Sequence, residues 1–126
     1  MTSTIYNTCV DCADPWSLAQ FWSQVIGRPI DDESSPGDEE VAIPLGGDHD
    51  LLFLRVPEPK SVKNRMHLCL QPDEAREPEV ERLLALGAAM LDDRREPDGT
   101  GWAVLTDPEG NEFCVLRSAT ERARTT

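Results

Sequence analysis

Apolar residues recur at helical spacing in two stretches of the chain. The first stretch follows the pair Asp14 and Pro15, which is typical of a helix start, and Gly27 ends it. Its apolar positions are Leu18, Phe21, Trp22, Val25 and Ile26. A second, shorter stretch begins at Pro78 and ends at Gly87, the expected C-terminal cap. The pattern predicts one amphipathic helix in each half of the chain.

Strand-like runs surround both helices. They are short apolar segments separated by turn clusters such as "GGDHD", "EPDGTG" and "DPEGN". One run precedes each helix, and two or three follow it. The predicted strands are residues 5–12, 41–45, 51–56, 65–71, 89–92, 102–106 and 113–117.

The two halves repeat at an interval of 60 residues without an insertion. Such a repeat is most simply explained by a duplicated supersecondary unit, in which matched residues occupy equivalent places. The matched pairs include Asn7 with His67, Cys9 with Cys69, Gly27 with Gly87, Phe53 with Phe113 and Leu54 with Cys114.

Composition and charge limit the possible partners. The 126 residues suit a single domain, residues 1–126, with repeat halves of about 1–57 and 61–118 joined by the linker "VPEPKSVKN". The formal net charge of −12 would repel nucleic acid and anionic membranes. No apolar run approaches the ~20 residues that span a bilayer, and the N-terminus lacks the pattern of a secretory signal. We therefore expect a cytoplasmic protein that binds neither nucleic acid nor membrane. Its polar tail, "SATERARTT", should fray.

Four cysteines raise the question of a metal or redox site. Cys9 and Cys12, in "CVDC", have the spacing of such a pair. In a strand, however, residues three apart point to opposite faces, so these two thiols could not hold one ion. We favour buried, reduced cysteines, with a metal or redox pair as the alternative.

The segments "FWSQVIGRPI", "NRMHLCL" and "WAVLTDPEGNEFCVL", set in the duplicated unit, resemble the vicinal oxygen chelate superfamily. This superfamily includes glyoxalase I, extradiol dioxygenases, and fosfomycin and bleomycin resistance proteins, and the chain looks closest to small glyoxalase-like bacterial members. The resemblance implies an α+β fold in which two tandem βαβββ modules form a curved sheet around a cavity, with helices on the convex side. It also implies a homodimer.

In metal-using members of the superfamily, four equivalent positions carry imidazole and carboxylate ligands. The resemblance assigns these positions to Asn7, Leu54, His67 and Cys114. Leu54 has no donor atom and Asn7 has only an amide oxygen, so two strong donors are left, fewer than the three that catalytic zinc usually needs. We therefore predict no metal ligand and no cofactor, with zinc or nickel on His67 and Cys114 as the alternative.

Strand alternation predicts the residues that face the cavity. Leu68 and Leu70 should face the helix, which leaves His67 and Cys69 on the concave face. The predicted ligand-binding residues are Asn7, Cys9, Leu54, Cys69, Trp102 and Cys114, and His67 is the catalytic candidate. Two alternatives stay open: Trp102 could plug the sheet, and His67 could make a structural hydrogen bond.

These observations favour a glyoxalase-like protein that binds a small, partly apolar organic molecule without a metal. It would sequester the molecule or change it by acid–base chemistry through His67, with Asn7 as orienting partner. The alternative is a divalent-metal-dependent lyase or isomerase of the glyoxalase type with an atypical ligand set. A third hypothesis is an acidic interaction module with a vestigial pocket.

Overall fold

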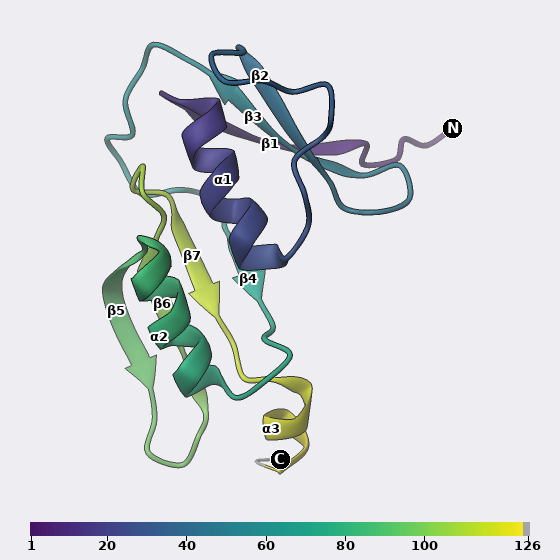
Figure 1. Cartoon of the computed structure of the whole chain (residues 1–126). Coiled ribbons are helices and arrows are strands. Elements are labelled where there is room, and N and C mark those ends of the chain that lie inside the picture. Colours follow the sequence, from purple (N-terminus) through teal and green to yellow (C-terminus); the bar gives the residue numbers. More distant parts are fainter. Residues whose placement is uncertain (125–126) are drawn as a thin grey trace. The chain divides into compact units, whose positions relative to one another are not determined.

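The computed structural model describes residues 1–124, which form two compact units. The first unit ends at Lys60 and the second begins at Ser61, inside the predicted linker. We refer to them as the first and second modules (Figure 1). Among the described residues, no helix is long and apolar enough to cross a membrane.

The first module packs one helix on a three-stranded sheet. Its elements are β1 (Asn7–Cys12), α1 (Pro15–Ile26), β2 (Glu40–Pro44) and β3 (Asp50–Arg55), and the sheet order is β1-β3-β2. The strand β1 runs parallel to β3, and β2 runs antiparallel to it. Helix α1 begins and ends as predicted. The Asp14 side chain accepts a hydrogen bond from the Ser17 N–H at 3.3 Å, and Gly27 adopts the left-handed conformation with φ 69°.

The second module contains a four-stranded sheet. Its elements are β4 (Leu68–Leu70), α2 (Arg76–Leu86), β5 (Ala89–Arg95), β6 (Gly101–Thr106), β7 (Glu112–Val115) and α3 (Ala119–Arg124), and the sheet order is β4-β7-β6-β5. The helix α2 begins two residues before the predicted Pro78, which the first helical turn accommodates because its N–H groups have no intrahelical acceptor. The strand β4 is much shorter than the predicted 65–71, so His67 lies immediately before it.

The core of each module lies between its helix and one face of its sheet. Alternate residues of the strands are fully buried on that face, as in "FCV" of β7, where Phe113 and Val115 have no exposed surface. In the helices, the buried positions include Phe21 and Trp22 of α1 and Val80 of α2. The predicted helix faces are therefore confirmed. The helix of each module does not cover the opposite face of its sheet.

The first module differs from the predicted βαβββ unit because only two strands follow its helix. Residues 29–35, which correspond to β5 at an interval of 60, form no strand. Within them, Asp31 N–H donates to the carbonyl of Ala42 at 2.9 Å, as an added strand would. The segment "RPIDDESSPGDEE" contains two prolines, which cannot donate to a ladder, and closely spaced carboxylates, which are poor strand formers. The second module has the complete βαβββ order.

The sheet registers show that the 60-residue repeat is not uniform. Cys9 pairs with Leu52 in the first module, whereas Cys69 pairs with Cys114 in the second. If Cys9 corresponds to Cys69, then Cys114 corresponds to Leu52, and the predicted match of Leu54 with Cys114 is wrong by two residues. The second module is therefore two residues longer between its paired strands than the first. These two residues lie after the helix, in the part of the chain that forms the hairpin of β5 and β6.

Because of this shift, Phe53 and Phe113 do not occupy the equivalent positions in the two modules that the 60-residue repeat predicted. Both are nevertheless completely buried on the helix-facing side of β3 and β7. A shift of two residues keeps each side chain on its own face of the sheet, whereas a shift of one would reverse it. The predicted faces therefore hold even though the predicted register does not.

The tail does not fray as predicted, because residues 119–124 form α3. Ser118 and Glu121 make a capping box: Glu121 N–H donates to the Ser118 hydroxyl at 3.1 Å, and Ser118 N–H donates to the Glu121 carboxylate at 3.0 Å. The same carboxylate accepts from the N–H of Arg76 at 2.8 Å, which ties α3 to the start of α2. Residues 125–126 of the predicted tail lie outside the described residues.

Candidate functional site

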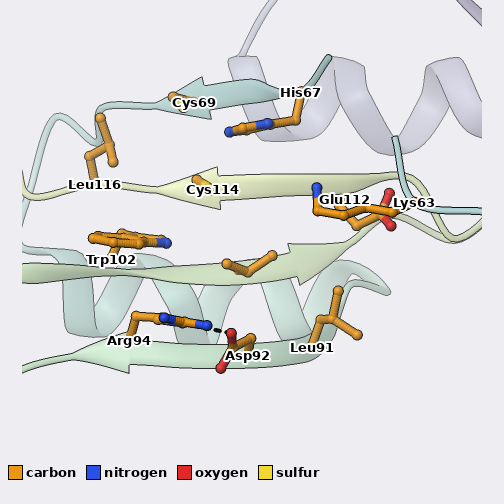
Figure 2. A pocket seen from close by; sticks show the side chains of 11 residues that line it. Lys63, His67, Cys69, Leu91, Asp92, Arg94, Trp102, Glu112, Cys114 and Leu116 are labelled. Carbon is orange, nitrogen blue, oxygen red and sulfur yellow. Dashed lines mark hydrogen bonds and ion pairs between the residues drawn. The ribbon is translucent and has the colours of Figure 1, made fainter. Parts of the chain in front are cut away.

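A hollow of about 510 Å³ lies on the face of the second sheet that α2 does not cover (Figure 2). All of its lining residues belong to the second module. They are Lys63, His67, Cys69, Leu91, Asp92, Arg94, Trp102, Val104, Glu112, Cys114 and Leu116. We call this feature the sheet hollow.

One row of paired residues forms the floor of the sheet hollow. Cys69 of β4 pairs with Cys114 of β7, Cys114 pairs with Val104 of β6, and Val104 pairs with Asp92 of β5. Paired residues on neighbouring strands project from the same face, so all four strands contribute to the site. At β5 the register slips between Met90 and Asp92, and this irregularity brings Leu91 to the lining.

The turn before β7 holds Cys114 in this row. Asp107 is buried, and its carboxylate accepts hydrogen bonds from the backbone N–H groups of Glu109 and Asn111 at 2.9 and 3.0 Å and from the side-chain amide of Asn111. Gly110 takes a positive φ of 91°. The "DPEGN" signal therefore forms the predicted turn, and it fixes where β7 begins.

Apolar surface is exposed along the sheet hollow. Trp102 is 42% exposed although β6 is an inner strand, and Leu91 is 56% exposed. In Figure 2 the Trp102 ring and Leu116 lie at one end of the site, and Leu91 lies at the other. Trp102 thus lines the hollow from the uncovered face of the sheet, and its contact with a ligand stays a prediction.

Charged groups of both signs border the sheet hollow. Arg94 donates to the carboxylate of Asp92 at 2.7 Å, and this pair is solvent-exposed. Glu112 is 8% exposed and accepts a hydrogen bond from the N–H of Asn64 at 3.1 Å. Lys63 lies at the same end of the site as Glu112 (Figure 2). The lining thus carries two cationic and two anionic side chains.

His67, Cys69 and Cys114 bring their donor atoms together where β4 and β7 form the floor of the sheet hollow. One imidazole nitrogen and the two Sγ atoms lie within 4.8 Å of one another. His67 and Cys69 are exposed, whereas Cys114 is buried. Burial raises the pKa of the Cys114 thiol, and the neighbouring Cys69 adds to that increase while Lys63 opposes it. A thiol in this environment is not activated as a free nucleophile.

The structure brings together four of the predicted site residues, namely His67, Cys69, Trp102 and Cys114. The other three, Asn7, Cys9 and Leu54, belong to the first module. There they share one face of the sheet, because Asn7 and Cys9 lie two residues apart on β1 and Cys9 pairs with Leu52, which lies two residues before Leu54.

The predicted burial of the cysteines is only half correct. Cys12 is buried and its thiol donates to the carbonyl of Leu54 at 3.5 Å, and Cys114 is buried as well. Cys9 and Cys69 are exposed, because both project from the uncovered face of their sheets. None of the four forms a disulfide, and the opposite orientation of Cys9 and Cys12 agrees with their odd spacing in a strand.

The four ligand positions implied by the superfamily do not fit a carboxylate–imidazole metal site in this chain. Leu54 offers no donor, and Asn7 offers only an amide oxygen. Of the four, only His67 and Cys114 belong to a candidate cluster, and its third member, Cys69, is not among the implied positions. The sequence analysis counted possible metal donors only at the four implied positions and therefore did not include Cys69.

Sequence reasoning also missed Glu112, Lys63, Leu91, Asp92 and Arg94 as lining residues. A signal for Glu112 was present: it precedes Cys114 by two residues in "NEFCVL" and therefore shares its face. The slip in β5 hid Leu91 and Asp92, since simple alternation would place neighbours on opposite faces. No local pattern marks Lys63, which precedes β4 in a loop.

Comparison with solved structures gives the same fold at low sequence identity. The protein ATC0852 from Agrobacterium tumefaciens superposes with a TM-score of 0.70 at 19% identity, over 94% of this chain and 99% of that one. A glyoxalase-related enzyme from Fulvimarina pelagi gives 0.69 at 19% identity, over 91% and 88%. The fosfomycin resistance protein FosX from Mesorhizobium loti gives 0.68 at 17% identity, over 98% and 99%.

These neighbours confirm the α+β fold of the vicinal oxygen chelate superfamily. A model of the glyoxalase-like domain matches residues 7–116, and the chain belongs to this family. No curated protein matches the chain in sequence.

Proposed function

We propose that this protein binds a small, partly apolar organic molecule in the sheet hollow of its second module. The observation that carries the proposal is the hollow itself, about 510 Å³ in volume and lined by both apolar and hydrogen-bonding side chains. Small-molecule sites in proteins commonly measure roughly 300–1,000 Å³ and combine an apolar lining with a few polar groups that orient the ligand.

Trp102 supplies a surface on which a flat or apolar ligand part can rest. The residue is 42% exposed, and its ring lies on a sheet face without a covering helix. Burying an aromatic side chain completely contributes about 1.5–3 kcal/mol, so covering the exposed part of Trp102 would contribute on the order of 1 kcal/mol. Leu116 lies at the same end of the site and extends this apolar surface, and Leu91 adds an apolar side chain at the other end (Figure 2).

The charges around the sheet hollow favour a ligand with little net charge. Lys63 and Arg94 are balanced by Asp92 and Glu112, and Arg94 is already paired with Asp92 at 2.7 Å. The formal net charge of −12 on the whole chain further disfavours a strongly anionic ligand. His67, exposed beside the floor of the hollow, can donate or accept the hydrogen bond that orients a hydroxyl or carbonyl group.

The family supports a small-molecule role in general terms. Solved neighbours include a lactoylglutathione lyase from Agrobacterium tumefaciens and the fosfomycin resistance protein, both named after small organic molecules. Binding of the organic molecule needs no metal ion. In the metal-free protein, turnover would add to binding a proton transfer through His67.

A fragment panel tests this function. Neutral, cationic and anionic aromatic compounds would be screened by ligand-observed NMR and by thermal shift against the full chain. We expect saturable binding that favours neutral compounds, and Trp102→Ala should weaken it at least threefold. The matched control is Trp16→Ala, since Trp16 is a half-buried tryptophan on α1 of the first module. Absence of saturable binding, or equal binding by Trp102→Ala and the wild type, would overturn the proposal.

A further inference from the structure

We propose that His67, Cys69 and Cys114 form a three-donor site for a thiophilic metal ion, zinc in the first place, built entirely within the second module. The inference goes beyond the proposed function, because it requires no organic ligand and is tested with the metal alone. It also departs from the ligand set that the superfamily resemblance implied, since Cys69 is not part of that set and neither Asn7 nor Leu54 takes part.

The geometry of the donors is the first argument. The imidazole nitrogen and the two Sγ atoms lie within 4.8 Å of one another. Around a tetrahedral zinc ion, with bonds of about 2.0–2.3 Å, ligand atoms are separated by about 3.5–3.8 Å. Closing the donors onto an ion therefore needs movements of about 1 Å or less from each. Since His67 and Cys69 are exposed, changes of side-chain rotamer can supply these movements.

The fold explains why the three donors meet. Cys69 and Cys114 are directly paired on the parallel strands β4 and β7, so their side chains project from the same face. His67 precedes Cys69 by two residues, and its ring lies beside the paired strands in Figure 2. The strand β4 is at the edge of the sheet, where solvent can reach the donors. In the first module, by contrast, Cys9 pairs with Leu52 and has no second thiol opposite it.

The donor set selects the class of ion. Two thiolates and one imidazole suit zinc, cadmium or copper(I), whereas magnesium, calcium and manganese prefer oxygen ligands. Three protein ligands leave one position of a tetrahedral ion open, and here that position would face the sheet hollow. The carboxylates of the hollow are not part of the cluster, which among the described residues consists of His67, Cys69 and Cys114.

In the test, the chain of residues 1–126 is reduced, treated with a chelator and titrated with cobalt(II) and then with zinc. Cobalt bound by two thiolates gives an intense sulfur-to-metal charge-transfer band, and competition by zinc removes it. We expect about one ion per chain, and zinc-edge X-ray absorption should show two sulfur neighbours at about 2.3 Å. Cys69→Ser should lower the affinity at least tenfold and reduce the charge-transfer band.

Cys9→Ser is the matched control, because Cys9 is likewise an exposed cysteine on the first strand of its module. It should bind the metal as the wild type does. Cys69→Ala, read by circular dichroism, checks that loss of binding is not loss of folding; Cys69 is exposed, so the fold should persist. Absence of the charge-transfer band in the wild type, an undiminished band in Cys69→Ser, or an equal loss in Cys9→Ser would each overturn the proposal.

Discussion

Phe21→Ala should remove a large part of the stability of the first module. Phe21 is 5% exposed on α1, and its ring meets that of Trp22 edge to face, with centroids 5.4 Å apart and an interplanar angle of 89°. Truncating a buried phenylalanine typically costs about 3–5 kcal/mol, which includes the transfer of the ring and the cavity left behind. This total includes the loss of an aromatic pair of this geometry, which contributes about 0.5–1.5 kcal/mol.

The expected loss of about 4 kcal/mol is large against a total stability of about 5–15 kcal/mol. Urea denaturation followed by far-ultraviolet circular dichroism measures it, and the midpoint should fall while the slope stays unchanged. Phe21→Leu, which keeps most of the volume, provides a smaller step if the alanine variant does not fold. Tyr6→Ala is the control, because Tyr6 is 71% exposed and should change stability by less than ~0.5 kcal/mol. A loss below ~1 kcal/mol for Phe21→Ala would show that the packing of α1 is not what holds this module.

Two further stability predictions concern the second module. The buried Arg76 guanidinium donates to the carbonyl of Gly101 at 2.7 Å and to those of Gly99 and Thr100. Arg76→Met should therefore lower the free energy of unfolding, measured in urea, by about 2–3 kcal/mol. Arg82→Met, at an exposed arginine, should lower it by less than ~1 kcal/mol, and equal losses in the two variants would contradict this role of Arg76. Hydrogen bonds from the backbone N–H of Ser118 and then of Arg76 lower the pKa of Glu121 from its usual value of 4.5, so the carboxylate stabilises the fold above that pH and this stabilisation is lost as the pH falls. Glu121→Gln should therefore be less stable than the wild type at pH 7 and should lose less stability on acidification. A parallel loss of stability in both proteins would contradict this prediction.

Local interactions determined the parts of the fold that could be predicted from the sequence. The ends of α1 depend on Asp14, Pro15 and Gly27, which act on the residues next to them. The turn before β7 depends in the same way on Asp107 and Gly110. Strand alternation has a period of two, so it assigned faces correctly even where the repeat was displaced by two residues. The capping box at Ser118 was equally local and was present in the sequence as "SATE".

Tertiary structure decided the register, the meeting of His67, Cys69 and Cys114, and the extent of the candidate site. Cys69 and Cys114 are far apart in the sequence, and only the pairing of β4 with β7 makes them neighbours. The donor count from the sequence therefore stopped at two, and the structure supplies the third. The slip in β5 likewise lets the neighbouring residues Leu91 and Asp92 both line the sheet hollow, whereas strict alternation would place them on opposite faces of the sheet. Such contacts depend on which strands pair and in which register, and that choice is made by packing across the whole module rather than by neighbouring residues.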